Sequence, residues 1–83
     1  MDEKLISLVN RVVNEVIPEA NMNIVKCDEN LQNCGMNSIE FISIIVALEE
    51  KLEIEIPDEY LLITQMNTVT KICNVLSEVL DET

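Results

Sequence analysis

Hydrophobic residues recur at helical spacing in three stretches of the chain. Between residues 3 and 17, apolar positions lie three or four residues apart with polar side chains between them: Leu5, Leu8, Val9, Val12, Val13 and Val16. This spacing predicts an amphipathic helix that ends before Pro18, because the residue preceding a proline is driven out of the helical region. Thr68 is predicted to cap a final helix whose inner face holds Val69, Ile72, Cys73, Leu76, Val79 and Leu80.

The middle stretch, about residues 38 to 52, has more apolar side chains than one helix face can hold. One stripe suits a core, and it consists of Phe41, Ile45, Leu48 and Leu52, with Ile44 beside them. A second stripe lies on another side, next to Glu40, Ser43 and Glu50, and consists of Ile39, Ile42 and Val46. Exposed apolar stripes mark partner contacts, unless neighbouring helices cover them.

The connections between these stretches differ in length. Residues 18–37 form a link longer than most helix-to-helix connections, and we expect a helical turn near residues 28 to 31. Four apolar residues are predicted to pin this link across the helices: Ile24, Val25, Leu31 and Cys34. The next link, residues 53–57, alternates like a strand but has nothing to pair with, so we expect an extended segment anchored by Ile54 and Ile56.

Residues 58–63 then predict a short third helix with acidic residues in its first turn. The expected fold is therefore all-α: a small four-helix bundle, three main helices plus the short third one, with a long loop between helices one and two. A chain of 83 residues has room for one small domain, here residues 1–83. Aromatic residues make up only 2% of it, so the core must be aliphatic.

The charge balance limits the possible partners. The chain has 16 acidic and 5 basic residues and a formal net charge of −11. Nucleic acids and anionic membranes bind proteins through Lys and Arg, so neither is an expected partner. Such acidity suits partners with basic surfaces, although it would also serve solubility alone.

Few residues could support catalysis. The chain contains no histidine, and the one plausible nucleophile, Ser38, has no neighbouring base in the sequence. The three cysteines are an odd number and none form a C-x-x-C pair, so a zinc site has little support. Reduced thiols in the cytoplasm are the simplest interpretation, and the chain is not expected to be an enzyme by itself.

Ser38 stands where the middle helix should begin. Gly35 precedes it by three residues, and Ser38 is expected at or beside the N-cap, with its hydroxyl facing solvent at the positive end of the helix dipole. A phosphate ester on that oxygen would be held by the same helix end. Most serines at such positions simply cap the helix.

Several residues around Ser38 form a motif. Their spacing is D-x-x-L-x-x-C-G-x-N-S-I, from Asp28 to Ile39, and it resembles the attachment motif of acyl and peptidyl carrier proteins. Residues 48–59 are similar to that family's second-helix end and third-helix entry, and the resemblance extends over residues 28–76. It implies that a phosphopantetheinyl transferase uses Mg²⁺ and coenzyme A to attach 4′-phosphopantetheine covalently to Ser38. The protein would then be a monomeric, non-catalytic carrier of acyl, aminoacyl or ketide groups held as thioesters.

The resemblance also implies a partner face on the middle helix and its surroundings. Loading enzymes and downstream synthases or transferases with basic docking surfaces would contact Met36, Asn37, Ile39, Glu40, Ile42, Val46, Glu49, Glu50, Ile56 and Glu59. Asn37 replaces the family's usual Asp, and Ser43 stands where fatty-acid-type carriers usually keep a Glu. These departures favour a carrier for nonribosomal peptide or polyketide biosynthesis. A fatty-acid-type carrier and an unmodified acidic interaction module of the same fold are the alternatives.

Overall fold

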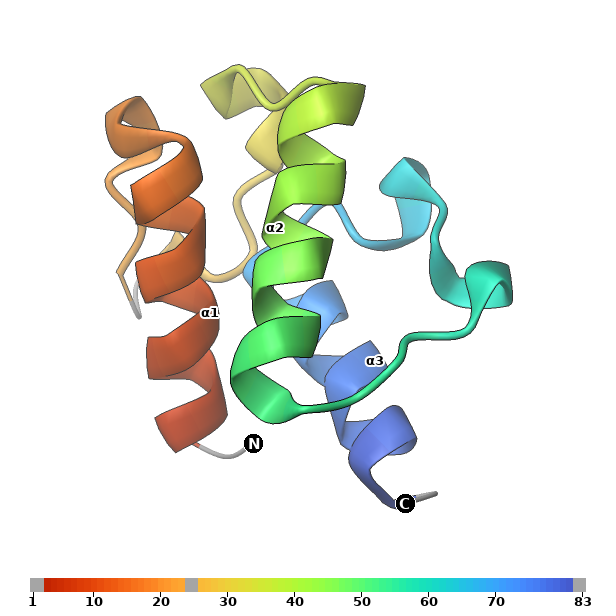
Figure 1. Cartoon of the computed structure of the whole chain (residues 1–83). Coiled ribbons are helices and arrows are strands. Elements are labelled where there is room, and N and C mark those ends of the chain that lie inside the picture. Colours follow the sequence, from red (N-terminus) through yellow and green to blue (C-terminus); the bar gives the residue numbers. More distant parts are fainter. Residues whose placement is uncertain (1–2, 24–25, 82–83) are drawn as a thin grey trace.

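Three α-helices and several short 3₁₀ turns make up the protein, as a computed structural model describes it for residues 3–23 and 26–81 (Figure 1). The helices are α1 (Glu3–Val16), α2 (Ser38–Leu52) and α3 (Val69–Asp81). The 3₁₀ turns are η1 (Pro18–Ala20), η3 (Leu31–Cys34), η4 (Asp58–Tyr60) and η5 (Ile63–Gln65). The described residues contain no strand, and the predicted all-helical fold is confirmed.

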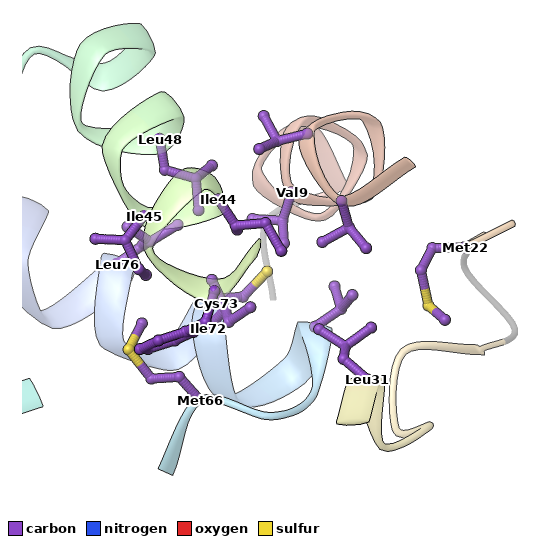
Figure 2. Close-up of a cluster of buried hydrophobic side chains, with 14 of the residues drawn as sticks. Val9, Met22, Leu31, Ile44, Ile45, Leu48, Met66, Ile72, Cys73 and Leu76 are labelled. Atoms are coloured by element: carbon purple, nitrogen blue, oxygen red, sulfur yellow. The ribbon is translucent and has the colours of Figure 1, made fainter. Parts of the chain in front are cut away.

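The core lies where α1 packs against both α2 and α3. Figure 2 shows aliphatic side chains from all three helices meeting there, with side chains of the connecting segments closing the cluster. Four of the five α2 residues predicted to face the core are buried, namely Phe41, Ile44, Ile45 and Leu48, and the fifth, Leu52, is partly buried against it. Cys73 is fully buried on the inner face of α3, where it behaves as a small hydrophobic side chain.

The first loop is tied to α1 as soon as it leaves that helix. Ile17 departs from helical geometry, with φ −128° and ψ 79°, and Pro18 begins η1. The side-chain amide of Asn14 then forms two hydrogen bonds with the backbone of Met22. It donates to the Met22 carbonyl at 2.9 Å and accepts from the Met22 N–H at 2.6 Å. The chain therefore turns back along α1 before it crosses to the other helices.

The middle of the long loop is pinned to the start of α3. Leu31 donates its N–H to the carbonyl of Asn67 at 2.7 Å, and Thr70 donates to the carbonyl of Cys27 at 3.0 Å. Leu31 is fully buried, so its predicted role as an anchor is confirmed. The helical turn expected near residues 28 to 31 forms slightly later, as η3. The predicted anchors Ile24 and Val25 lie outside the described residues.

The predicted short third helix is wrong in detail, because residues 58–63 form no α-helix. After η4 the chain makes an inverse γ-turn at Leu61 (φ −86°, ψ 52°), where Leu62 N–H donates to Tyr60 O at 2.9 Å. Leu62 is extended, and only then does η5 begin. No residue from Pro57 to Gln65 is buried. Tyr60, Leu61 and Ile63 pack only partly against the core, so this short run gains too little from packing to complete an α-helix.

The link between α2 and η4 is extended, as predicted. Glu53 ends α2 in the left-handed conformation (φ 54°), and Ile54 to Pro57 follow without regular structure. Ile56 is buried, and its N–H donates to the carboxylate of Glu49 at 2.8 Å. In Figure 1 this link leaves the lower end of α2 and leads away from it to η4 at the right of the view, before the chain returns to α3.

Substituting Leu31 tests its role as the main anchor of the long loop. Leu31→Ala should lower the free energy of unfolding by about 2 to 5 kcal/mol, because it removes a fully buried side chain and leaves a cavity. Leu62→Ala is the control, since Leu62 is 50% exposed and its truncation should cost less than about 1 kcal/mol. Urea denaturation of both variants measures the difference, and equal losses would show that Leu31 is not an anchor.

Candidate functional site

A tight turn leads from η3 into α2. Gly35 ends η3 with φ 102°, a conformation that side chains with a Cβ rarely adopt. A Cβ at this position would meet no heavy atom within 4 Å, so the glycine serves the backbone conformation and not the available space. Met36 follows, buried beneath the turn, with its N–H donating to the carbonyl of Leu31 at 3.1 Å. The anchor Leu31 thus sets the direction from which the chain enters α2.

A capping box begins α2, and its two members are Asn37 and Glu40. Asn37 is the N-cap, and its side-chain oxygen accepts the N–H of Glu40 at 2.9 Å. In return, the carboxylate of Glu40 accepts the N–H of Asn37 at 3.1 Å. Two backbone donors that have no partner inside the helix are satisfied in this way. Asn37, and not Ser38, is therefore the residue that caps α2.

Ser38 is the first residue of α2, directly beside the N-cap. The interpretation that Ser38 only caps the helix is therefore wrong, because Asn37 has that role. Ser38 is exposed, and its hydroxyl forms no hydrogen bond with any other residue in the described part of the chain. Within the same part, the N–H groups of Ser38 and Ile39 also have no acceptor, as expected for the first turn of a helix.

This arrangement fits a phosphate ester on the Ser38 oxygen. The hydroxyl has no partner among the described residues, and it belongs to the first residue of a 15-residue helix, at the positive end of the helix dipole. No described side chain accepts a hydrogen bond from the Ser38 hydroxyl.

The second apolar stripe of α2 is exposed, as predicted. The exposed fractions of Ile39, Ile42 and Val46 are 78%, 48% and 45%, so neither α1 nor α3 covers them. The stripe begins at the residue after Ser38 and continues for two turns along α2. Ser43 lies beside it and donates its hydroxyl to the carbonyl of Ile39 at 3.0 Å.

Two residues of the predicted partner face lie in the core instead. Met36 and Ile56 are each only 4% exposed, so they support the turn and the extended link and cannot offer their side chains to a partner. Glu49 is half-buried, and its carboxylate holds the N–H of Ile56. By contrast, Glu50 and Glu59 are exposed.

A hollow of about 460 Å³ lies between the C-terminal half of α2 and the extended link, and the stripe residue Val46 forms part of it. Two of its acidic lining residues, Glu55 and Asp58, are absent from the predicted partner face. The sequence did contain a signal for Glu55. In the alternating run of residues 53–56, an inward Ile56 requires its neighbour Glu55 to point outward.

Cys34 is the closest cysteine to Ser38 in the sequence, and it lies in η3. Burial raises the pKa of its thiol, and the negative charge of Glu29 raises it further. The thiol donates to a Glu29 carboxylate oxygen at 3.8 Å, which also favours the protonated form, while Lys26 acts in the opposite direction. A protonated thiol is a poor nucleophile, so Cys34 does not add a reactive group to the site.

Residues 3–23 and 26–81 hold no group of three or more side chains that could bind a metal ion. Across these same ranges, no helix combines the length and the apolar character needed to span a membrane.

Comparisons with known proteins agree with the geometry. The model of a family described as "Phosphopantetheine attachment site" matches residues 3–76. The chain is also 38% identical over 58 residues to a protein named "Acyl carrier protein" from Prochlorococcus marinus (strain MIT 9515). That alignment covers 69% of this chain and 71% of the relative. No solved structure gives a significant match.

Two substitutions test whether Asn37 or Ser38 caps α2. Asn37→Ala should lower the free energy of unfolding by about 0.5 to 2 kcal/mol, because it removes the acceptor for the N–H of Glu40. Ser38→Ala should change it by less than about 0.5 kcal/mol, since the hydroxyl has no partner among the described residues. Urea denaturation decides between them, and a loss for Ser38→Ala as large as that for Asn37→Ala would contradict this assignment.

Proposed function

This chain belongs to the phosphopantetheine-binding carrier protein family, and we propose that Ser38 is the residue to which its prosthetic group is attached. Members of the family hold phosphopantetheine covalently, and the family assignment extends this cofactor to the chain. The observation that carries the proposal for Ser38 is its exposed hydroxyl, without a hydrogen-bond partner in the described structure, on the first residue of α2.

Attachment requires a transferase. The oxygen of Ser38 forms a bond to the phosphorus that carries the pantetheine in coenzyme A, and the phosphoanhydride bond breaks. Adenosine 3′,5′-bisphosphate leaves, and a base of the transferase takes the serine proton. The turn from Gly35 to Asn37 contributes by presenting Ser38 in a fixed, exposed position. Mg²⁺ would act between the transferase and coenzyme A, since the described residues offer no metal site of their own.

The attached group supplies a terminal thiol on which an acyl, aminoacyl or ketide cargo is carried as a thioester. The protein itself is proposed to be non-catalytic, and partner enzymes carry out the reactions on the cargo. Its contribution is to keep the cargo at high effective concentration near whichever enzyme is docked. We place this activity in the cytoplasm, where the three cysteines, none of which is in a disulfide, would stay reduced.

The exposed stripe of α2 is the proposed docking surface for these enzymes. Its apolar part consists of Ile39, Ile42 and Val46, which extend from Ser38 along the helix. Val46 lies eight residues after Ser38, about 12 Å along the helix axis, so a docked enzyme would also be close to the modified serine. Glu50 adds negative charge near the far end, Glu59 is exposed on η4, and the chain as a whole carries a formal charge of −11. Basic surfaces on the transferase and on the loading and downstream enzymes would complement this face.

The pathway is a finer proposal. Ser43 lies beside the stripe in place of the Glu of fatty-acid-type carriers, and this favours a carrier for nonribosomal peptide or polyketide biosynthesis. The similarity to a protein named "Acyl carrier protein" supports a second candidate, a fatty-acid-type carrier. Both candidates use the same serine and the same arm, and they differ in the enzymes that dock.

Intact mass spectrometry tests the attachment site. The purified protein is incubated with coenzyme A, Mg²⁺ and a broad-specificity phosphopantetheinyl transferase. The parent protein should gain the mass of one phosphopantetheine, and Ser38→Ala should gain none. Ser43→Ala is the matched control, because Ser43 is an exposed serine one turn further along α2 and should leave the mass gain intact. A modified Ser38→Ala protein would refute the assignment, and a parent that several transferases leave unmodified would favour the unmodified interaction module.

The docking surface is tested with the same transferase reaction. Ile42→Ala should lower kcat/KM by roughly tenfold, mainly through KM, because it truncates an apolar contact near the modified serine. Leu80→Ala provides the control, since Leu80 is also partly exposed but lies at the end of α3. Added salt should weaken both the parent and the variant reactions by slowing association between oppositely charged surfaces. Equal kinetics for Ile42→Ala and Leu80→Ala would exclude the stripe as the transferase contact.

A further inference from the structure

The capping box of α2 consists of two hydrogen bonds with different electrical character. In one, the neutral amide oxygen of Asn37 accepts the N–H of Glu40 at 2.9 Å. In the other, the charged carboxylate of Glu40 accepts the N–H of Asn37 at 3.1 Å. Only the second bond places a negative charge at the helix N-terminus, and Ser38 lies between the two partners in the sequence.

A phosphodiester on Ser38 brings a second negative charge to this helix end. The N–H groups of Ser38 and Ile39, which donate to no acceptor in the described structure, are the donors nearest to its attachment point. The helix N-terminus carries the equivalent of about half a positive charge, which is less than one anion and much less than two. The carboxylate of Glu40 and the phosphate would therefore repel each other across a short distance near the protein surface.

Of the two anions, the Glu40 carboxylate can move away more easily than the phosphate. The phosphate is covalently fixed to Ser38, whereas the carboxylate is held by one hydrogen bond on a half-buried, flexible side chain. The bond between the Asn37 side chain and the N–H of Glu40 involves no charge, so it persists and keeps the start of α2 in place.

We propose that modification of Ser38 opens the charged half of this capping box, so that Glu40 changes from a helix cap into a free carboxylate of the docking surface. This inference rests on the attachment of phosphopantetheine to Ser38 proposed above. The released carboxylate adjoins Ile39, the most exposed residue of the apolar stripe. Glu40 then acts as a specificity-determining residue: the transferase meets the unmodified protein with Glu40 tied to the backbone. Enzymes that place a basic side chain opposite Glu40 then bind the modified protein more tightly than the unmodified one.

Amide hydrogen exchange of Asn37 reports directly on the charged half of the box. It is measured by NMR on the full chain, before and after enzymatic attachment of phosphopantetheine, in the parent protein and in Glu40→Gln. Glutamine at this position keeps the capping hydrogen bond but carries no charge, so it is a matched control. The N–H of Phe41, which donates to the carbonyl of Asn37 at 2.9 Å, serves as the internal reference for the intact helix start.

Attachment should raise the exchange rate of the Asn37 amide by about tenfold in the parent protein, corresponding to loss of one charge-assisted hydrogen bond. In Glu40→Gln the change should be less than about twofold, and Phe41 should not change in either protein. A nearby phosphate alone would slow hydroxide-catalysed exchange, so a faster rate cannot arise from its electric field.

An unchanged or slower Asn37 exchange rate in the modified parent protein would show that Glu40 is not released. It would not contradict Ser38 as the attachment site. An equal increase in the parent and in Glu40→Gln would also overturn it, because the effect would then not depend on charge. If the intact mass shows no attachment to Ser38, the proposed function fails and this inference fails with it.

Discussion

The presentation of Ser38 depends on one buried residue, Leu31. Its side chain is fully buried in the core, and its backbone N–H is bound to the carbonyl of Asn67 just before α3. The carbonyl of Leu31 in turn accepts the N–H of Met36, which closes the turn through Gly35. A loop that is long in sequence therefore arrives at α2 from a fixed direction. Since this chain is small and its core is aliphatic, such anchors are the main way to give a surface serine a defined position.

Helix α2 then serves two purposes with its two faces. Its inner face contributes Phe41, Ile44, Ile45 and Leu48 to the core, so the helix cannot rotate without exposing them. That constraint keeps Ile39, Ile42 and Val46 at the surface, next to the serine that begins the helix. Attachment and docking can be combined on one rigid element for this reason, and the protein needs no catalytic groups of its own to support transfer of a cargo between enzymes.

Features governed by local periodicity or capping could be predicted from the sequence. The bounds of α2, the Thr68 cap of α3 and the exposed stripe follow from spacing and from side-chain chemistry within a few residues. The errors concern features that depend on distant contacts. Met36 and Ile56 were assigned to the surface through the family resemblance, yet each is only 4% exposed and belongs to the core. The third helix failed because Tyr60, Leu61 and Ile63 are only partly buried against the core, which the local sequence does not reveal.

The most direct test of this account locates the attached group within the chain. After modification, trypsin should release the peptide of residues 27–51, which contains Ser38, Ser43 and Cys34 together. Fragmentation of this peptide by mass spectrometry shows which side chain carries the added mass. Phosphopantetheine should be found on Ser38 alone, because the hydroxyl of Ser38 is exposed at the start of α2 and has no hydrogen-bond partner among the described residues. Attachment to Ser43 or Cys34 would contradict the assignment of the site and the role of the turn that presents it.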